Sequence, residues 1–265
     1  NIYSSFTDPS SANYETEDIG FGLKTSFPLS VDRYLEIRYS LYTAKIKANA
    51  NATAYENALA GTDTVSNLGY SLAFDKRNSR YKPSKGFNLV LNQDLAGLGG
   101  NSYYYKNSFE FNTYKRLSNS FIGAYKLQAG NINGYNDKYA PLSSNFKLGG
   151  KELRGFKSGK IGPKFGNSYT GGQYYYLTSL ETNIDLNIDA FDITTTLFID
   201  VGSVWGLEDP AYGAINDDHE SRSSIGLNFN WDSAIGPINI VYAKIIESNK
   251  NDTTDNLYFD IGYNF

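Results

Sequence analysis

Apolar and polar residues alternate along most of the chain, and the alternation is clearest at its C-terminal end. In NLYFDIGYNF, one side of the segment carries Leu257, Phe259, Ile261, Tyr263 and Phe265, and polar or small residues occupy most of the positions between them. A period of two predicts a β-strand with one apolar and one polar face. The segments SSIGLNFNW, FDITTTLFIDVG and YLEIRYSLYT repeat the pattern. No segment shows a helical period, so the sequence predicts an all-β protein.

The same pattern predicts twelve strands in the whole chain, with ends placed to within a few residues. They cover residues 1–8, 17–28, 33–47, 66–76, 85–95, 102–116, 119–131, 172–187, 190–204, 221–231, 236–246 and 255–265.

The connections between these strands alternate in length. Short connections contain PLSVD, KRNSRYKPS, RLSNS, NID and DSAIGP, whereas the long ones cover 48–65, 132–171, 205–220 and 247–254. The link at 96–101 is the exception, because it is short where a long one is due. In an up-and-down antiparallel sheet, this order places the short turns at one rim and the long loops at the other. Transmembrane antiparallel β-barrels of the outer membrane have this asymmetry.

The mean hydropathy of the chain is negative, which fits either a soluble β-sandwich or lipocalin-like barrel or a membrane barrel whose alternate residues face lipid. Alternation alone does not say which face is wet. Three observations favour the membrane. Many strands exceed the ~5–6 residues usual in soluble sheets, and Tyr and Phe gather at strand ends, as in the runs NSYYYKNSFEF and GGQYYYL. The polar strand faces also carry charges that suit an enclosed wet lumen: Glu36, Arg38, Glu110, Glu181 and Asp200.

Composition excludes several classes of protein. The chain has no cysteine, hence no disulfide framework and no thiolate metal site. A net charge of −4 with scattered Lys and Arg gives no reason to expect nucleic acid as a partner. No run approaches the ~18 apolar residues of a membrane helix. We expect no cofactor and no metal site.

Residues 132–171 have no strand pattern of their own, and a loop of this length is usually functional. The segment GGKELRGFKSGKIGP within it is rich in glycine and contains a single arginine, Arg154. A guanidinium inside a folded-in loop needs acceptors, and carboxylates are the natural ones. Glu181 and Asp200 lie on the polar faces of the two strands that follow. The sequence therefore predicts that this loop plugs the barrel and is anchored by Arg154 to Glu181 and Asp200.

The ordered motifs FKLGGKELRGFKSGKIGPK, GGQYYYLTSLE, FIDVGSVW and IGLNFNWDSAIGPINIVYA resemble the BamA family of outer-membrane β-barrel assembly factors. The resemblance covers most of the chain from about residue 66 onward, and LRGF is its most specific part. The family usually has Val where Leu153 stands. The family's inward-folded R-G-F loop maps onto Arg154, Gly155 and Phe156, and its partner carboxylates map onto Glu181 and Asp200.

The resemblance implies a sixteen-stranded barrel preceded by periplasmic POTRA domains, in which the seam between the first and last strands is a lateral gate. We therefore expect residues 1–265 to be a single barrel domain, the C-terminal part of a longer protein without its first strands and POTRA domains. The chain begins at Asn1 without a leader, which fits this expectation. The last strand would be one edge of the gate and, by resemblance, the C-terminal β-signal.

The function implied is an insertase that folds β-barrel proteins into the bacterial outer membrane without covalent chemistry. Its partners would be outer-membrane lipids, nascent β-barrel clients and accessory lipoproteins. Two alternatives remain: a passive porin, and the polypeptide-translocating pore of the related secretion branch. A hydrolase would need a serine with a histidine partner. The one histidine, His219, lies in the charged loop sequence INDDHESR, so we expect no enzyme and no metal at that loop.

Overall fold

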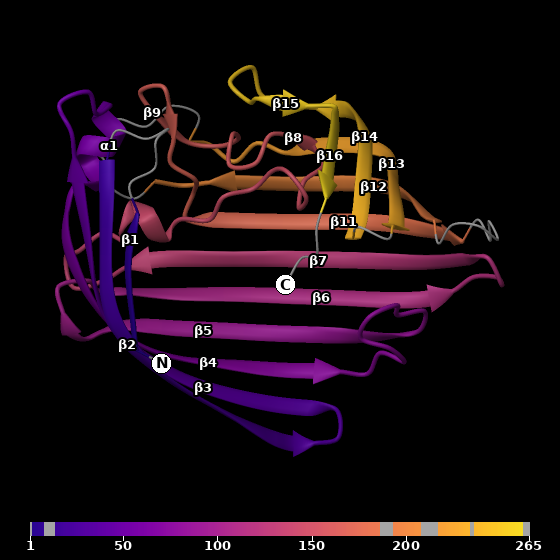
Figure 1. The fold of residues 1–265 in the computed structure, drawn as a ribbon, viewed down its shortest axis with the longest axis horizontal. Coiled ribbons are helices and arrows are strands. Elements are labelled where there is room, and N and C mark those ends of the chain that lie inside the picture. The colour runs from indigo at the N-terminus through magenta and orange to yellow at the C-terminus, as the bar shows by residue number, and fades with distance from the viewer. Residues whose placement is uncertain (1, 8–13, 186–192, 208–216, 234–235, 262–265) are drawn as a thin grey trace.

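The computed structural model describes residues 2–7, 14–185, 193–207, 217–233 and 236–261. Its main element is one antiparallel sheet of twelve strands (Figure 1). Among the described residues, no helix is both long and apolar enough to cross a membrane.

The strands of the sheet follow one another in chain order, except that a long insert separates β7 from β11. They are β1 (Ile2–Thr7), β2 (Tyr14–Ser30), β3 (Arg33–Ala48), β4 (Gly61–Asp75), β5 (Gly86–Gly100), β6 (Tyr104–Arg116), β7 (Phe121–Gly134), β11 (Tyr174–Asp185), β12 (Ile193–Trp205), β13 (Arg222–Ser233), β14 (Gly236–Glu247) and β16 (Leu257–Ile261).

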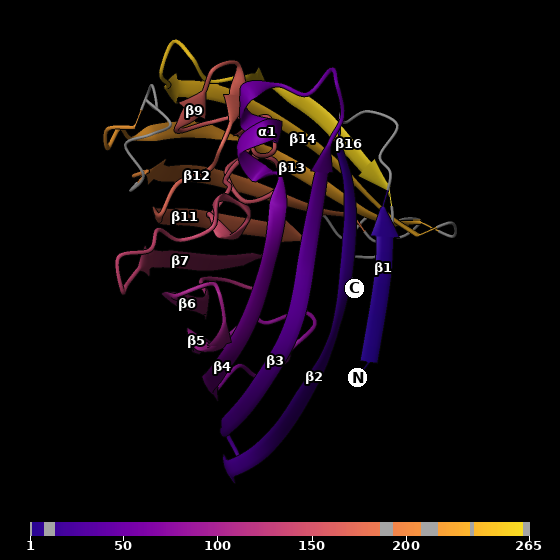
Figure 2. The ribbon, with the colours of Figure 1, turned by 90° about the vertical axis from the view of Figure 1, so that its left-hand side faces the viewer.

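The sheet curls until its two edge strands, β1 and β16, lie on the same side of the molecule (Figure 2). Each strand pairs antiparallel with its neighbour in the sequence, as the alternating loop lengths predict. Short turns such as 31–32 and 117–120 lie at one end of the strands, and the long connections from β3 to β4 and from β7 to β11 lie at the other (Figure 1). The predicted fold class, an up-and-down membrane barrel, is confirmed in its architecture.

In β11 and β12 the outer face of the sheet is largely apolar and exposed, and the inner face is largely buried and carries polar residues. In β12, Leu197 and Ile199 are 45% and 42% exposed, whereas Phe198 and Asp200 between them are 2% and 0% exposed. The same contrast holds in β11, where Leu180 is exposed and Glu181 is buried. A soluble barrel would bury its apolar rows instead. The pattern of exposure therefore places the apolar rows against lipid.

The insert between β7 and β11, residues 135–173, folds back inside the curved sheet (Figure 2). It contains a 3-10 turn, η1 (Leu142–Ser144), and three two-residue strands, β8 (Gly155–Phe156), β9 (Lys164–Phe165) and β10 (Ser168–Tyr169). β9 pairs with β10, and β8 pairs with β15 (Thr254–Asp255) just ahead of the last strand. Several insert side chains form one buried cluster with the inner faces of β11 and β12: Leu148, Leu153, Phe156, Ile161, Leu177 and Val204.

Two features differ from the sequence prediction. A short helix, α1 (Ala54–Leu59), lies in the loop at the end of β3, where we expected no helix. Thr53 accepts a hydrogen bond from the Glu56 amide, and the Glu56 carboxylate accepts one from the Thr53 amide, so a capping box stabilises a helix too short to show a period. Several strands also extend beyond their predicted ends, for example β4 to Gly61 and β5 to Gly100, because glycine does not interrupt a paired strand there.

Candidate functional site

Arg154 lies at the tip of the insert, and its side chain is only 8% exposed. Its Nε and Nη2 atoms donate to the two carboxylate oxygens of Asp200 at 2.7 and 2.6 Å. Nη2 also donates to Glu181 Oε1 at 2.8 Å and to Ser179 Oγ at 2.9 Å. The guanidinium lies over the ring of Phe198, 3.6 Å from its centroid. Arg154 thus binds both carboxylates that the sequence predicted as its partners, Glu181 and Asp200.

The receptor for this arginine is built from two neighbouring cross-strand rows on the inner face. Register pairs Lys126 with Ser179, Ser179 with Asp200, and Asp200 with Ser224. The next row contains Glu181 opposite Phe198. Ser224 Oγ donates to the Arg154 carbonyl oxygen at 2.6 Å, so the backbone of the insert tip is bound as well as its side chain.

The charges of the receptor balance. Lys126 Nζ lies 2.8 Å from Glu181 Oε2, so two cations face two carboxylates. Burial opposes the charge of the guanidinium, but the hydrogen bonds and attraction from Asp200 and then Glu181 outweigh it and raise the pKa of Arg154. Removing one cation or one carboxylate from this buried group leaves an uncompensated charge. Lys126 was not predicted, because the register of β7 with β11 spans the insert and is not readable from sequence. Ser179 was missed although it lies two residues before Glu181 and therefore on the same face of β11.

Gly155 and Phe156 have separate roles in seating the insert. Gly155 has a φ of +93°, and a Cβ atom there would lie 2.6 Å from Ile245 Cδ1. Phe156 is fully buried in the cluster shared with Leu177 and Val204. Only glycine combines a positive φ with the absence of a Cβ atom, and position 155 requires both.

The insert also contacts the last strand from inside the barrel. Gly155 and Phe156 pair with Asp255 and Thr254, immediately before β16. The Tyr258 hydroxyl donates to the Gly150 carbonyl at 3.1 Å, and Lys151 forms an ion pair with Asp260. Both Tyr258 and Asp260 belong to β16. The insert therefore braces the inner face of an edge strand.

Two of the residues predicted as gate edge and β-signal, Leu257 and Phe259, lie on the outer face of β16. Leu257 and Phe259 are 64% and 73% exposed, and Ile261 pairs in register with Ile238 of β14. The remaining two predicted residues, Tyr263 and Phe265, lie outside the described residues. The signal role of this strand stays a prediction.

A second buried ion pair supports the loop that precedes β16. Arg222 Nε lies 2.9 Å from Asp252 Oδ2, and both side chains are fully buried. Arg222 also donates to the Glu220 carbonyl at 2.6 Å. This pair was not predicted either, because Arg222 at the start of β13 and Asp252 in the loop between β14 and β15 are far apart in the chain.

His219 is exposed at the long-loop rim and packs on aromatic rings. Its ring centroid lies 4.7 Å from that of Trp205 and 5.8 Å from that of Tyr176. Over the residues that the structure describes, there is no cluster of three or more His, Asp or Glu side chains suited to a metal ion.

The fold and the anchored insert together define a membrane β-barrel with an internal plug, and three comparisons identify its relatives. The model of the Omp85 superfamily domain matches residues 1–265. The chain is 26% identical to the outer membrane protein assembly factor BamA of Neorickettsia risticii over 98% of this chain and 36% of that protein. It is 25% identical to BamA of Neisseria meningitidis over 100% of this chain and 39% of that protein.

Two further matches extend the comparison. The sorting and assembly machinery component 50 homolog of Bos taurus is 33% identical over 46% of this chain and 26% of that protein. The crystal structure of BamA from Haemophilus ducreyi, lacking POTRA domains 1–3, superposes with a TM-score of 0.84 at 22% identity, over 97% of this chain and 57% of that one.

The chain belongs to the Omp85 superfamily. It is a bacterial outer-membrane protein, and the BamA-family resemblance of its motifs is confirmed. It spans less than half of the length of the curated BamA relatives that it matches.

Proposed function

We propose that the chain is the barrel of a factor that assembles other β-barrel proteins in the outer membrane. The assembly-factor names of relatives similar over the whole chain support this function. The exposed apolar outer face supports a barrel that works within the bilayer. In the longer protein, residues 1–265 would form the C-terminal barrel portion, with further strands and POTRA domains ahead of them.

The observation that carries the proposal is the last strand, β16, which pairs with β14 on one side and is held from inside the barrel by the insert. In the longer protein, its other side would meet the first strand of the whole barrel, and this seam would be the place where a client strand adds. An unpaired backbone group in hydrocarbon costs several kcal/mol. A client strand that pairs with this edge satisfies both chains, as in β-strand addition. The edge of β16 then acts as one side of a lateral gate.

In this mechanism the insert has a positioning role and the protein performs no covalent chemistry. The Arg154 anchor fixes the insert to β11 and β12, and the contacts of Gly150, Lys151 and Gly155–Phe156 reach the last strand. The insert thereby holds the gate edge at a defined position while clients add to it. Lipids around the barrel and accessory lipoproteins complete the expected set of partners.

Charge reversal of the anchor tests the proposal in cells that depend on the full-length protein. Arg154→Glu faces two carboxylates and should lower the folded amounts of several unrelated outer-membrane barrels. Asp200→Arg in the same chain restores an opposite pair and should recover part of the loss. Lys157→Glu, an exposed change in the same insert, is the matched control.

The readout is the heat-modifiable, folded fraction of each client barrel on gels. A normal set of client barrels in the Arg154→Glu strain, together with loss of one exported polypeptide, would favour the translocating pore. Normal clients with altered ion conductance would favour a porin.

A further inference from the structure

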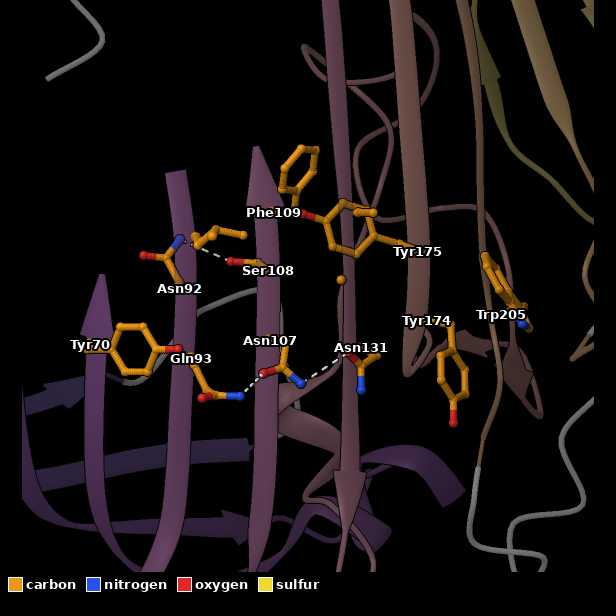
Figure 3. Close-up of a pocket in the computed structure, with 13 residues that line it drawn as sticks. Tyr70, Asn92, Gln93, Asn107, Ser108, Phe109, Asn131, Tyr174, Tyr175 and Trp205 are labelled. Atoms are coloured by element: carbon orange, nitrogen blue, oxygen red, sulfur yellow. Dashed lines mark hydrogen bonds between the residues drawn. The ribbon is translucent and has the colours of Figure 1, made fainter. Parts of the chain in front are cut away.

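A row of uncharged polar and aromatic side chains crosses the outer face of the sheet. Register places one residue from each of six neighbouring strands in this row: Tyr70, Gln93, Asn107, Asn131, Tyr174 and Trp205 (Figure 3). The flanking row on the same face is apolar and includes Leu91, Phe109 and Ala129. Three adjacent amides on a lipid-facing surface require an explanation, because hydrocarbon does not hydrogen-bond them.

The amides form a directional ladder with open ends. Gln93 Nε2 donates to Asn107 Oδ1 at 2.7 Å, and Asn107 Nδ2 donates to Asn131 Oδ1 at 3.2 Å (Figure 3). In the described part of the chain, no hydrogen bond is found for Gln93 Oε1 or Asn131 Nδ2. The ladder thus presents an acceptor at one end and a donor at the other. It suits a ligand with hydroxyl or amide groups.

The row descends from the long-loop rim toward the middle of the sheet. Trp205 is the last residue of β12 and Tyr174 the first of β11, whereas Tyr70 lies well inside β4. Trp205 and Tyr174 stack with ring centroids 5.8 Å apart, as expected for aromatic residues at the water interface of a bilayer. The amide ladder therefore lies next to the headgroup level of the leaflet on the long-loop side.

Two adjoining hollows follow the row. The first, of about 410 Å³, is lined by the polar row and by Leu91, Phe109 and Ala129. The second, of about 620 Å³, shares Tyr70 and Gln93 with it and is otherwise mainly apolar, with Leu35, Ile37, Leu68, Leu95 and Tyr105. A polar hollow continuous with an apolar one matches the shape of an amphiphile.

The lining also constrains charge. Of the residues lining either hollow, Asp94 alone is charged. Its carboxylate is held by Arg38, with Nη2 to Oδ2 at 2.6 Å. The hollows therefore contain no cation to select a phosphate or carboxylate headgroup.

We propose that this face binds one membrane lipid with an uncharged, hydroxyl-rich headgroup, such as a sugar-bearing lipid. The headgroup hydrogen-bonds to Gln93, Asn107 and Asn131, and an acyl chain follows the apolar hollow toward Ile37. The inference rests on the outer-membrane location alone and holds whether the protein is an assembly factor or a pore.

Photocrosslinking in the full-length protein tests the site. Benzoylphenylalanine replaces Phe109, and the protein is reconstituted in phosphatidylcholine vesicles that contain a minor, known fraction of diacyl galactosylglycerol. Lipid adducts are then quantified by mass spectrometry. We expect enrichment of the galactolipid by roughly tenfold over its mole fraction, which corresponds to about 1.4 kcal/mol. The enrichment should vanish in Asn107→Leu, which removes both ladder hydrogen bonds.

A second variant and two controls keep the result interpretable. Ala129→Phe fills the first hollow but leaves the amides in place, and should also abolish enrichment. Thr182→Val on the same outer face should retain it, and the photoprobe at Ile199 should report the bulk mole fraction. Adducts at position 109 that track the mole fraction would overturn the proposal. Crosslinks to a second copy of the chain would overturn it as well, since the row would then be a protein interface.

Discussion

Arg154, Gly155 and Phe156 are adjacent in sequence, but each is held by a different physical requirement. Arg154 is bound by charge-assisted hydrogen bonds, Gly155 by a positive φ in a confined space, and Phe156 by apolar packing. Substitutions at the three positions should therefore fail in distinguishable ways.

Gly155→Ala should destabilise the seated insert through both backbone strain and a clash. A positive φ costs a non-glycine residue about 1–3 kcal/mol, and the new Cβ would meet Ile245 Cδ1 at 2.6 Å. Gly166→Ala is the control, because Gly166 has a φ of +59° with open space around it. We expect a lower urea midpoint for Gly155→Ala than for Gly166→Ala, since only position 155 combines a larger positive φ with a close contact. Equal midpoints would show that position 155 is not tightly packed.

Arg154→Lys keeps the charge but loses the two-pronged bond to Asp200. Lysine is a point charge that does not satisfy Asp200, Glu181 and Ser179 together. Because breaking a buried pair costs about 3–5 kcal/mol, a substantial part of that cost should appear in the free energy of unfolding in lipid vesicles. A change below the experimental error would mean that water or Lys126 compensates the carboxylates.

Sequence reasoning located this anchor only in part. The facing of Glu181 and Asp200 follows from a period of two, so both were predicted to point inward. Ser179 lies two residues before Glu181, so the same period places it on the inner face, but nothing in the sequence marks it as a partner of Arg154. The positions of Lys126 and Ser224 depend on strand register, and the register of β7 with β11 has no local signal because the insert separates the two strands.

At the scale of elements, the insert and β16 act as a coupled pair. Lys151→Glu would place a negative charge beside Asp260 and should loosen the inner face of β16. We expect faster hydrogen exchange at the amides of β16, with β12 and β13 unchanged. Asp260→Lys in the same chain should reverse the effect.

Lys164→Glu is the matched control for this exchange experiment. Lys164 belongs to the same insert, but its ammonium group lies over the ring of Tyr169, 4.9 Å from the ring centre. Tyr169 also belongs to the insert, so this contact does not involve β16. Protection of β16 that is unaltered in Lys151→Glu would show that the Gly155–Phe156 pairing alone holds the strand.

The strands of the sheet, helix α1 and the short strands of the insert differ in how well the sequence predicts them. All twelve strands were predicted, because most of them alternate apolar and polar residues over many positions. Helix α1 was missed because six residues do not display a helical period, although Thr53 and Glu56 carry the spacing of a capping box. The two-residue strands of the insert have no pattern, since their partners lie far away in the chain.

At the scale of the whole molecule, the outer face should reject charge where the inner face tolerates it. Ile199→Arg places a guanidinium in lipid and should cost about 2–4 kcal/mol if the residue lies near the bilayer midplane. Gln128→Arg, on the inner face opposite Glu110, should fold nearly as well as the unchanged protein. The folded fraction in vesicles measures both. Equal folding of the two variants would contradict the assignment of faces.

The pairing of Gly155–Phe156 with Thr254–Asp255 has a consequence for the protein's own biogenesis. The two segments are far apart in the chain, and bringing them together requires closure of a long loop. We therefore expect the plug to enter the lumen before the C-terminal hairpin takes its final position. A barrel completed in that order would not present the cell with an unobstructed hole in its outer envelope.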